Sequence, residues 1–410
     1  MDLVDLVVVG GGIAGAAIAS RMTAAGATVV VLEQTDRFVD RVRGEFIAPW
    51  GVREAIDLGL WDMILSVEHN NLISRIAPFE DTLPEDVAMA SMRDVTTLLP
   101  GVPGAVGISH PGLCEALLSH AASCGATVHR GTASTHVTGG AKPTVRWELG
   151  GHTFELSARV VVASDGRGSA IRRQFGLALH ETEATRFLAG MLVADTDGWP
   201  RDVGWIGIEG DREFIVFPQA DGLTRVYVGW SIDQPSRFGG ANRQQRFLAA
   251  TRANCASWAA ALADGTPAGP CSWFPMTDSW LDDPVQDGVV FAGDAAGWSN
   301  PLIGQGLSVA MRDAHVLTDT LLANEHWTHD TLQPYGDERR ERMRRLRLSL
   351  AVNQLSYGFG PEAAERRVRI RSITRAHPRL GLVRRTNMIG PWELPADVFS
   401  DETYETLATC

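Results

Sequence analysis

The sequence predicts an α/β fold in which a nucleotide-binding domain is interrupted by an inserted antiparallel β-sheet and followed by a helical C-terminal segment. A glycine-rich turn follows an apolar run near the start of the 410 residues, and a second glycine-rich motif begins at residue 293. Between about 180 and 275, short β-rich runs alternate with Gly, Asp and Pro, a pattern typical of an antiparallel sheet. A chain that leaves a nucleotide site and returns to it late explains both glycine motifs.

The first glycine motif has the order of a Rossmann-like βαβ unit. The apolar run 6–9 suits a buried parallel strand, Gly10 permits a tight turn, and Gly12 lets the chain approach a pyrophosphate. The helix expected over 13–25 directs unpaired N–H groups and its positive dipole end at that phosphate. Glu33 ends the next apolar run, where a carboxylate accepts hydrogen bonds from ribose hydroxyls. The predicted dinucleotide contacts are Gly10, Gly12, Ile13, Ala14, Gly15 and Glu33.

The remaining elements are predicted from apolar periodicity and from the residues that end each run. Helices are expected at about 51–58 and 113–125, and strands at 127–130, 144–149 and 152–156, while 158–163 is a valine-rich run. The inserted sheet is expected to contain strands at 187–193, 213–217 and 225–230, and a buried strand at 289–292 precedes the second glycine motif. We expect an interleaved nucleotide-binding domain (1–70, 107–180 and 280–330), a substrate domain (71–106 and 181–279) and a helical segment (331–410).

The composition excludes several classes of function. A formal net charge of −12 argues against nucleic acid as a general partner, and no apolar run is long enough to cross a membrane. The arginine-rich helix expected at 337–350 also carries acids, which favours a solvated, salt-bridged face over a nucleic-acid or membrane contact. Lys142, the single lysine, lies in a turn-like stretch, so Schiff-base chemistry has no buried lysine.

The cysteines indicate the compartment. They are odd in number and lack CxxC spacing, which favours free thiols over disulfides or a metal site: Cys114, Cys124, Cys255, Cys271 and Cys410. We therefore expect a cytoplasmic protein without a signal peptide, present as a monomer or a homodimer.

Four motifs together resemble one protein family. They are the segment Gly10–Gly15 with Glu33, the segment Arg41-x-Arg43-Gly44, Ser164-Asp165-Gly166, and the run from Gly293-Asp294 through Ser308. In this order, over roughly the first 330 residues, the chain resembles the single-component flavoprotein monooxygenases of the p-hydroxybenzoate hydroxylase type. The resemblance implies a Rossmann-like FAD-binding domain. It also implies an enzyme that uses NADPH or NADH and O2 to hydroxylate or epoxidise an aromatic or polycyclic small molecule through a flavin hydroperoxide.

The resemblance also assigns roles to residues. Asp294 matches the acid that binds a ribityl hydroxyl, and Asp165 matches a position that serves both FAD and the nicotinamide donor. Helix N–H groups at Gly304-Gln305-Gly306 face the pyrimidine edge of the flavin and stabilise the charge of the reduced ring. The guanidinium groups of Arg41 and Arg43 suit the diphosphate. The remaining implied FAD contacts are His110, Gly293, Pro301, Leu307 and Ser308.

The chain departs from the family's pattern at two positions. Gly297 follows Gly-Asp-Ala-Ala where the family commonly has histidine, a version shared with geranylgeranyl-reductase-like flavoproteins, and His110 stands where members often have Arg or Gln. A flavin reductase or dehydrogenase therefore stays an alternative, as does a non-catalytic flavin-binding protein. A flavin halogenase is less favoured, because that family relies on a lysine near the substrate and Lys142 is badly placed.

Substrate recognition is expected on one face of the inserted sheet and on tryptophans near the flavin motifs. Strand alternation separates Phe214 and Val216 from Ile215 and Phe217, and one of these faces should line the pocket. We expect a mainly apolar and aromatic pocket lined by Trp50, Phe214, Tyr227, Trp230 and Trp298. The sequence identifies no catalytic base, and it leaves open the substrate and the choice between NADH and NADPH.

Overall fold

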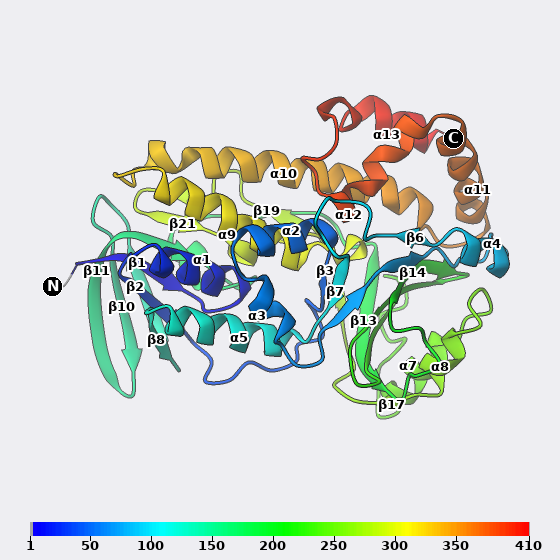
Figure 1. Cartoon of the computed structure of the whole chain (residues 1–410), viewed down its shortest axis with the longest axis horizontal. Coiled ribbons are helices and arrows are strands. Elements are labelled where there is room, and N and C mark those ends of the chain that lie inside the picture. The colour runs from blue at the N-terminus through cyan, green and yellow to red at the C-terminus, as the bar shows by residue number, and fades with distance from the viewer. Residues whose placement is uncertain (1–2, 410) are drawn as a thin grey trace.

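The structure is a computed structural model that describes residues 3–409, so Cys410 lies outside the described residues. Two large sheets lie at opposite ends of the long axis, and the C-terminal helices run along one side of both (Figure 1). The long helix α10 (His329–Ser356) spans the distance between them. This architecture confirms the predicted α/β fold with an inserted antiparallel sheet.

The first sheet carries the nucleotide-binding unit. Its main path is β20-β21-β11-β1-β2-β8, with β1 (Leu3–Val9) parallel to both β2 (Val29–Glu33) and β11 (His152–Ala163). Beyond them lie β8 (Thr127–Arg130) on one side and β21 (Val289–Phe291) on the other. The central parts of these strands, residues 6–9, 29–32 and 160–163, are apolar and buried because both faces of the sheet are covered there. The chain therefore returns at residue 289 to the sheet in which it began.

One expectation for this sheet was wrong. The strand predicted to end at 156 continues through the valine-rich run 158–163 as the single strand β11, whose first half pairs antiparallel with β10 (Thr144–Leu149). Strand β10 in turn pairs with β9 (Ala133–Thr138). Ser157 lies in register with both Leu3 and Thr144, so the strand continues through it without a turn.

Small residues let the helices approach one another closely around the first sheet. Helix α1 (Ile13–Ala24) packs against both α5 (His110–Ser123) and α9 (Gly306–Leu322), and α2 (Pro49–Asp57) packs on α9. The contacting face of α1 is built mainly of fully buried alanines. The starts of α1 and α9 line the same cavity, so two helix N-termini face one region.

The second sheet is largely antiparallel and has the order β17-β13-β16-β15-β14-β5-β6, with β18 also on β13. Its long strands are β13 (Arg186–Ala194), β14 (Val203–Glu209), β15 (Arg212–Pro218) and β16 (Thr224–Ser231), and its short ones are β5 (Arg75–Ala77), β6 (Arg93–Asp94), β17 (Thr266–Pro267) and β18 (Ser272–Pro275). Strand β14 was not predicted. One face packs on the core shared with the nucleotide-binding unit, and the other buries a separate core. The predicted domain boundaries stay a prediction.

The arginine-rich stretch of α10 corrects a prediction. Instead of presenting only a solvated face, it buries Arg339 and Arg342 against Asp313 of α9, with at most 2% of each of these side chains exposed. Arg340 and Arg344 on the other side are half-exposed and pair with acids of the same helix. An α-helix has between three and four residues per turn, so one side of α10 can be buried while the other faces solvent. The mixture of charges in the sequence does not show which arginines lie on which side.

The remaining helices and strands are short, except the 16-residue helix α11. They are α3 (Trp61–Leu65), α4 (Glu85–Ala90), α6 (Ala170–Gln174), α7 (Arg243–Thr251), α8 (Ala259–Ala263), α11 (Pro361–Ala376), α12 (Thr386–Ile389), α13 (Asp401–Ala408), β3 (Phe46–Ile47), β4 (Asn71–Ile73), β7 (Ala105–Gly107), β12 (His180–Glu181), β19 (Ser279–Trp280), β20 (Val285–Gln286), and the 3₁₀ turns η1 (Gly293–Ala296), η2 (Pro301–Ile303), η3 (Pro378–Arg385) and η4 (Ala396–Val398).

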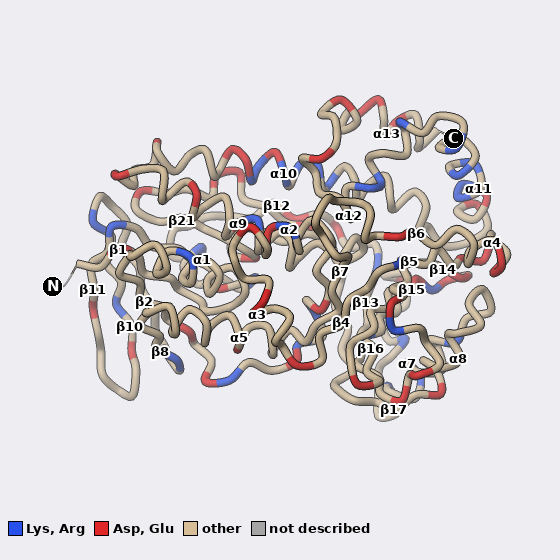
Figure 2. Tube along the Cα trace, in the orientation of Figure 1, with Lys and Arg blue, Asp and Glu red and all other residues tan. Residues whose placement is uncertain are grey.

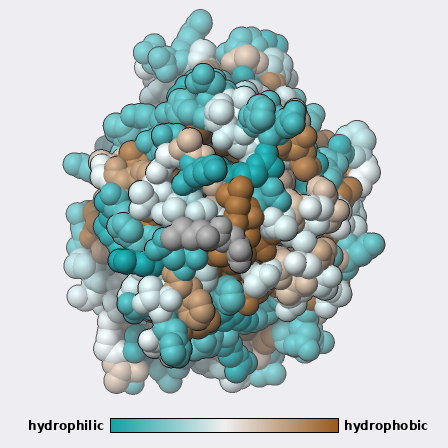
Figure 3. Space-filling model, turned by 90° about the vertical axis from the view of Figure 1, so that its left-hand side faces the viewer, coloured by the Kyte–Doolittle hydropathy of each residue, from teal (hydrophilic) through white to brown (hydrophobic). Residues whose placement is uncertain are grey.

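The surface carries both signs of charge. Basic and acidic residues are interspersed along most of the chain, with basic residues prominent on α11 (Figure 2). The end face nearest the N-terminus is mixed hydrophilic, with a few separate hydrophobic patches (Figure 3). Within residues 3–409, no helix is both long and apolar enough to span a bilayer.

Candidate functional site

A cavity of about 460 Å³ runs from the glycine turn of β1 to the inner face of the second sheet. Of the predicted cofactor contacts, all but Gly15 and Ser308 line it: Gly10, Gly12, Ile13, Ala14, Glu33, Arg41, Arg43, His110, Asp165, Gly293, Asp294, Pro301, Gly304, Gln305, Gly306 and Leu307. Residues from both glycine motifs therefore lie on one cavity, as the spacing predicted.

The glycine turn after β1 has the geometry that close approach of a phosphate requires. Gly10 has φ +100°, and a Cβ there would lie 2.4 Å from the carbonyl oxygen of Ser164. A Cβ on Gly15 would lie 2.0 Å from the Gly10 carbonyl oxygen, so Gly15 serves helix packing and not the cavity. A Cβ on Gly12 would have no neighbour within 4 Å, which leaves the start of α1 open to the cavity.

Glu33 is held at the end of β2 by backbone donors. Its Oε2 accepts from the Gly11 N–H at 2.8 Å, and its Oε1 accepts from the N–H and hydroxyl of Thr35, each at 2.8 Å. These bonds fix the carboxylate against the cavity wall, in the place where a ribose is bound in βαβ sites.

The two aspartates of the site are organised differently. Asp165 Oδ2 accepts from the N–H groups of Ala170 and Ile171 at 2.7 and 3.2 Å, while its buried Oδ1 has no hydrogen-bond partner among residues 3–409. Asp294 pairs with Arg167 Nε at 3.1 Å, and the Arg167 guanidinium lies 5.2 Å from the centre of the Trp298 ring. Sequence reasoning missed Arg167, although it directly follows Asp165-Gly166.

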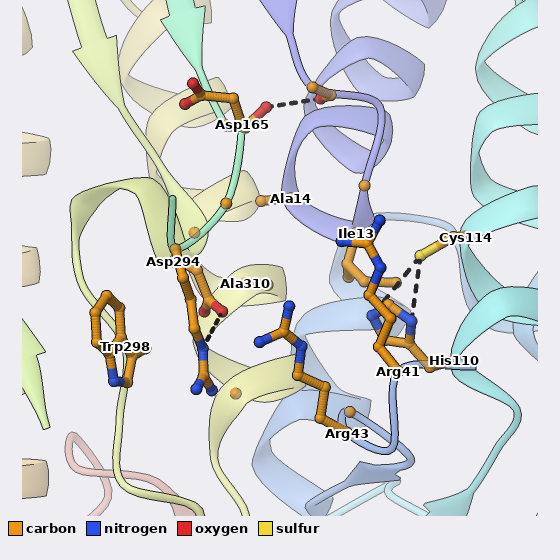
Figure 4. Close-up of a pocket in the computed structure, with 18 of the residues that line it drawn as sticks. Ile13, Ala14, Arg41, Arg43, His110, Cys114, Asp165, Asp294, Trp298 and Ala310 are labelled. Atoms are coloured by element: carbon orange, nitrogen blue, oxygen red, sulfur yellow. Dashed lines mark hydrogen bonds and ion pairs between the residues drawn. The ribbon is translucent and has the colours of Figure 1, made fainter. Parts of the chain in front are cut away.

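A group of cations faces Asp294 across the cavity. Arg41 and Arg43 project into it beside His110 (Figure 4), and neither guanidinium has a hydrogen bond or ion pair with any described residue. Burial lowers the pKa of Arg43, and the charge of Arg167 lowers it further. Burial and the charge of Arg43 lower the pKa of His110 to about 4, so this imidazole is neutral at pH 7. Unpaired guanidinium groups in a cavity favour an anionic ligand.

The start of α9 forms another wall. Gly304 has φ +64°, and a Cβ on Gly306 would have no neighbour within 4 Å, so this helix N-terminus is also open to the cavity. Gln305 accepts from Trp50 Nε1 at 2.7 Å and donates to the Asn387 carbonyl at 3.1 Å. The prediction that Trp50 lines the pocket is corrected, because its indole is turned to Gln305 and buried outside the cavity. Ser308 likewise lies behind the wall, where its Oγ accepts from the Ala48 N–H at 3.3 Å.

The loop that carries Asp294 is supported from behind by α10. Arg339 donates to the carbonyls of Gly293, Ala296 and Gly297 at 3.0, 2.9 and 2.9 Å. The same guanidinium pairs with Asp313, whose Oδ2 accepts from the Gly293 N–H at 2.7 Å. This network, which the sequence did not reveal, ties the second glycine motif to two helices.

The second sheet supplies an apolar end to the cavity. Leu188, Ile215, Phe217 and Tyr227 line it, and Trp298 lines it from the neighbouring loop. Ile215 and Tyr227 are cross-strand neighbours, so they share one face.

Phe214 and Trp230 were predicted to line the pocket, and the structure corrects both. Each is fully buried in the second core, on the opposite face from Ile215 and Tyr227. The prediction combined residues of both faces, whereas side chains of one strand reach the same face only at every second position.

A buried polar network lies under the apolar end. Tyr227 Oη donates to Glu45 Oε2, and Arg225 lies 3.2 Å from Glu45 Oε1 and 2.6 Å from Asp40. Burial raises the pKa of Glu45, and burial together with the charge of Glu45 raises the pKa of Tyr227. Tyr227 therefore keeps its proton at neutral pH.

These features fit FAD. The open start of α1 at Gly12 and the unpaired guanidinium groups suit a diphosphate, and the fixed Glu33 carboxylate suits a ribose. The open start of α9 suits the edge of a ring that carries negative charge. The unpaired Asp165 Oδ1 offers a further acceptor, and the apolar end suits an aromatic ring system.

Comparison with known proteins decides the family. The model of the FAD binding domain family matches residues 3–347. The chain belongs to this family. The match confirms FAD as the cofactor and the membership expected from the four motifs.

Two curated relatives and one solved structure are among the proteins to which the chain is similar. The chain is 24% identical over 404 residues to a ubiquinone hydroxylase of Rhodospirillum rubrum, covering 91% of this chain and 87% of that protein. It is 27% identical over 230 residues to a 3-(3-hydroxy-phenyl)propionate/3-hydroxycinnamic acid hydroxylase of Mycolicibacterium gilvum, covering 54% of this chain but 38% of that protein. The p-nitrophenol 4-monooxygenase structure from Pseudomonas putida DLL-E4 shares the fold, with a TM-score of 0.73 at 20% identity over 100% of this chain and 99% of that one.

Proposed function

We propose that this protein is an FAD-dependent monooxygenase that takes electrons from NADPH or NADH and transfers one oxygen atom of O2 to an aromatic or polycyclic small molecule. The observation that carries the proposal is the single cavity in which an FAD-fitting region continues into the apolar inner face of the second sheet. The hydroxylase and monooxygenase names of the similar proteins support it.

The described residues would divide the work along the cavity. Glu33 and the start of α1 would hold the ribose and diphosphate, with Arg41 and Arg43 as counter-charges. The start of α9 would place helix N–H groups at the ring, where a positive dipole end stabilises negative charge. When bound, the flavin supplies the redox and oxygen chemistry, and the protein supplies orientation and exclusion of water.

Tyr227 would line the substrate pocket as a side chain fixed by a hydrogen bond, and it would not act as a base. Its proton is held between Tyr227 Oη and the Glu45 carboxylate, and burial opposes its release. The neighbouring Arg225 keeps one charge in this network compensated. The network would therefore keep Tyr227 in a fixed position beside the substrate.

A comparison of reactions under air and under nitrogen tests the proposal. The holoenzyme, supplied with NADPH and a candidate substrate, should form product only under air, with oxygen uptake matching product. Equal product formation under nitrogen would instead assign the protein to the reductase alternative. The halogenase alternative is not favoured, because Lys142 is exposed between β9 and β10 and does not line the cavity.

A cytoplasmic location belongs to the proposal as well. Within residues 3–409, Cys114, Cys124, Cys255 and Cys271 are free thiols, which suits a reducing compartment. Fractionation of cells followed by immunodetection would test it, and recovery from an oxidising compartment would contradict it.

A further inference from the structure

A second cavity of about 500 Å³ lies between the second sheet and the C-terminal helices. Its walls come from β5 and β14 of the sheet, from the end of α10, and from α11, η3 and α12. In Figure 1 these helices lie over the end of the sheet that carries β6 and β14. The first cavity uses none of the residues that line the second.

The two cavities meet at a shared wall. Ile206 of the second cavity pairs across the strands with Ile215 of the first, and both lie on the inner face of the sheet. On the other side, Gln305 of the first cavity donates to the Asn387 carbonyl, and Asn387 lines the second. The contact between Gln305 and Asn387 occurs at the start of α9, so the second cavity lies close to the region assigned to the flavin ring.

Five arginines line the second cavity, and two of them are neutralised. Arg367 pairs with Asp81 at 2.6 Å, and Arg371 pairs with Glu80 and donates to Thr82 Oγ1 at 2.9 Å. Glu80 is the one carboxylate among the described residues that line this cavity.

The other three arginines have no such partners. Arg93, Arg384 and Arg385 form no side-chain hydrogen bond and no ion pair with any residue of the range 3–409. Burial lowers the pKa of Arg384. Burial on the cavity side, followed by the charges of Arg384 and Arg385, lowers the pKa of Arg93, although part of its side chain reaches solvent. Arg93 therefore lies near two like charges, and the described residues provide no ion-pair partner for any of the three arginines.

Three buried polar atoms on residues around this cavity lack hydrogen-bond partners within residues 3–409. Ser356 Oγ, Arg367 Nε and Asn387 Oδ1 are buried on residues that line the second cavity, and none has a hydrogen-bond partner among the described residues. Buried polar groups in folded proteins are nearly always satisfied, so the hydrogen bonding around this cavity is incomplete.

We propose that the second cavity binds the oxyanion group of an amphipathic substrate, whose apolar part lies against Ile206 on the side of the cavity nearest the flavin ring. Arg93, Arg384 and Arg385 would neutralise the oxyanion, and fork-like guanidinium groups suit a planar carboxylate. This assignment rests on the proposed function, and it replaces a purely apolar pocket with one that selects organic acids.

The charge requirement is tested with inorganic phosphate on the FAD-loaded protein. Titration calorimetry should detect binding to the wild type, and the affinity should fall at least tenfold in Arg384→Gln and in Arg93→Gln. Arg369→Gln is the matched control, because Arg369 lies half-exposed on α11, pairs with Glu365, and does not line the cavity. The two cavity variants should also melt at a higher temperature than the wild type without phosphate, because each removes a repelling charge. Absence of phosphate binding, or equal binding by all variants, would overturn the proposal.

A comparison of an acid with its amide tests whether the bound oxyanion belongs to the substrate or to the nicotinamide donor. 3-Phenylpropionate should perturb the flavin spectrum at a concentration at least tenfold below 3-phenylpropanamide, and Arg384→Gln should remove that preference. No acid preference would overturn the assignment to the substrate. A higher KM for NADPH in Arg384→Gln, with an unchanged KM for NADH, would also overturn it by assigning the cations to the donor's phosphate. Phosphate binding does not depend on oxygen transfer, so oxygen-independent product formation would refute the monooxygenase while leaving the anion site intact.

Discussion

Arg339→Met removes the guanidinium group that supports the second glycine motif from behind. The wild-type side chain is 2% exposed and bonds three loop carbonyls as well as Asp313. Met is also an unbranched side chain but has no hydrogen-bond donor. The three loop carbonyls therefore lose their donor, and Asp313 loses one of its two arginine partners. Arg342 and the Gly293 N–H remain on Asp313, which keeps the carboxylate from being wholly unpaired.

Breaking one side of a buried ion pair costs about 3–5 kcal/mol of unfolding free energy. Because Arg342 still compensates Asp313, we expect the lower part of that range. The loop that carries Asp294 loses its fixed position at the same time, so FAD affinity should fall at least about tenfold, or about 1.4 kcal/mol.

Urea unfolding of the apoprotein and fluorescence titration with FAD would measure the two effects separately. Arg340→Met is the matched control, because Arg340 is the next residue of α10 and its side chain is 48% exposed. The control should change stability by less than about 1 kcal/mol. If Arg339→Met bound FAD as tightly as Arg340→Met, the supporting role of α10 would be refuted.

Three further perturbations test other parts of the site. Asp294→Ala should weaken FAD binding at least tenfold, since each charged hydrogen bond contributes about 1.5–3 kcal/mol; equilibrium dialysis showing wild-type affinity would remove Asp294 from the site. Trp230→Ala should lower the unfolding free energy by about 3–5 kcal/mol while FAD stays bound, because Trp230 packs in the second core; a ligand-binding defect at unchanged stability would contradict its placement. The apoprotein should lose up to about 3 kcal/mol between pH 6.5 and pH 4, because His110 has a pKa of about 4 when folded and 6.5 when unfolded, so the unfolded chain binds the proton first. His110→Asn should flatten that pH dependence of urea midpoints, and an unchanged slope would show that other groups cause it.

The sequence was sufficient for the nucleotide-binding unit because its signals are local. Gly10 and Gly12 need their backbone geometry regardless of what packs around them, and Glu33 ends a strand that any βαβ unit would place beside them. The second motif could be assigned to the same cavity because an apolar strand at 289–291 precedes it.

The parts that failed depend on contacts between distant segments. Alternation showed that Phe214 and Ile215 face opposite ways, but both faces of the sheet are apolar, so the pattern could not tell which one lines the cavity. Arg339 looked like a solvated arginine because its neighbours in sequence are charged, whereas its partner Asp313 lies on another helix. The second cavity joins Arg93 to Arg384 across almost 300 residues, and no local pattern marks that meeting.

The most direct measurement of the central claim is the mass of the product formed from ¹⁸O2 by the FAD-loaded enzyme with NADPH. A monooxygenase predicts a product that carries one ¹⁸O atom, with the second atom recovered as labelled water. A product that carries no ¹⁸O after a reaction with ¹⁸O2 in unlabelled water would contradict the proposed oxygen transfer.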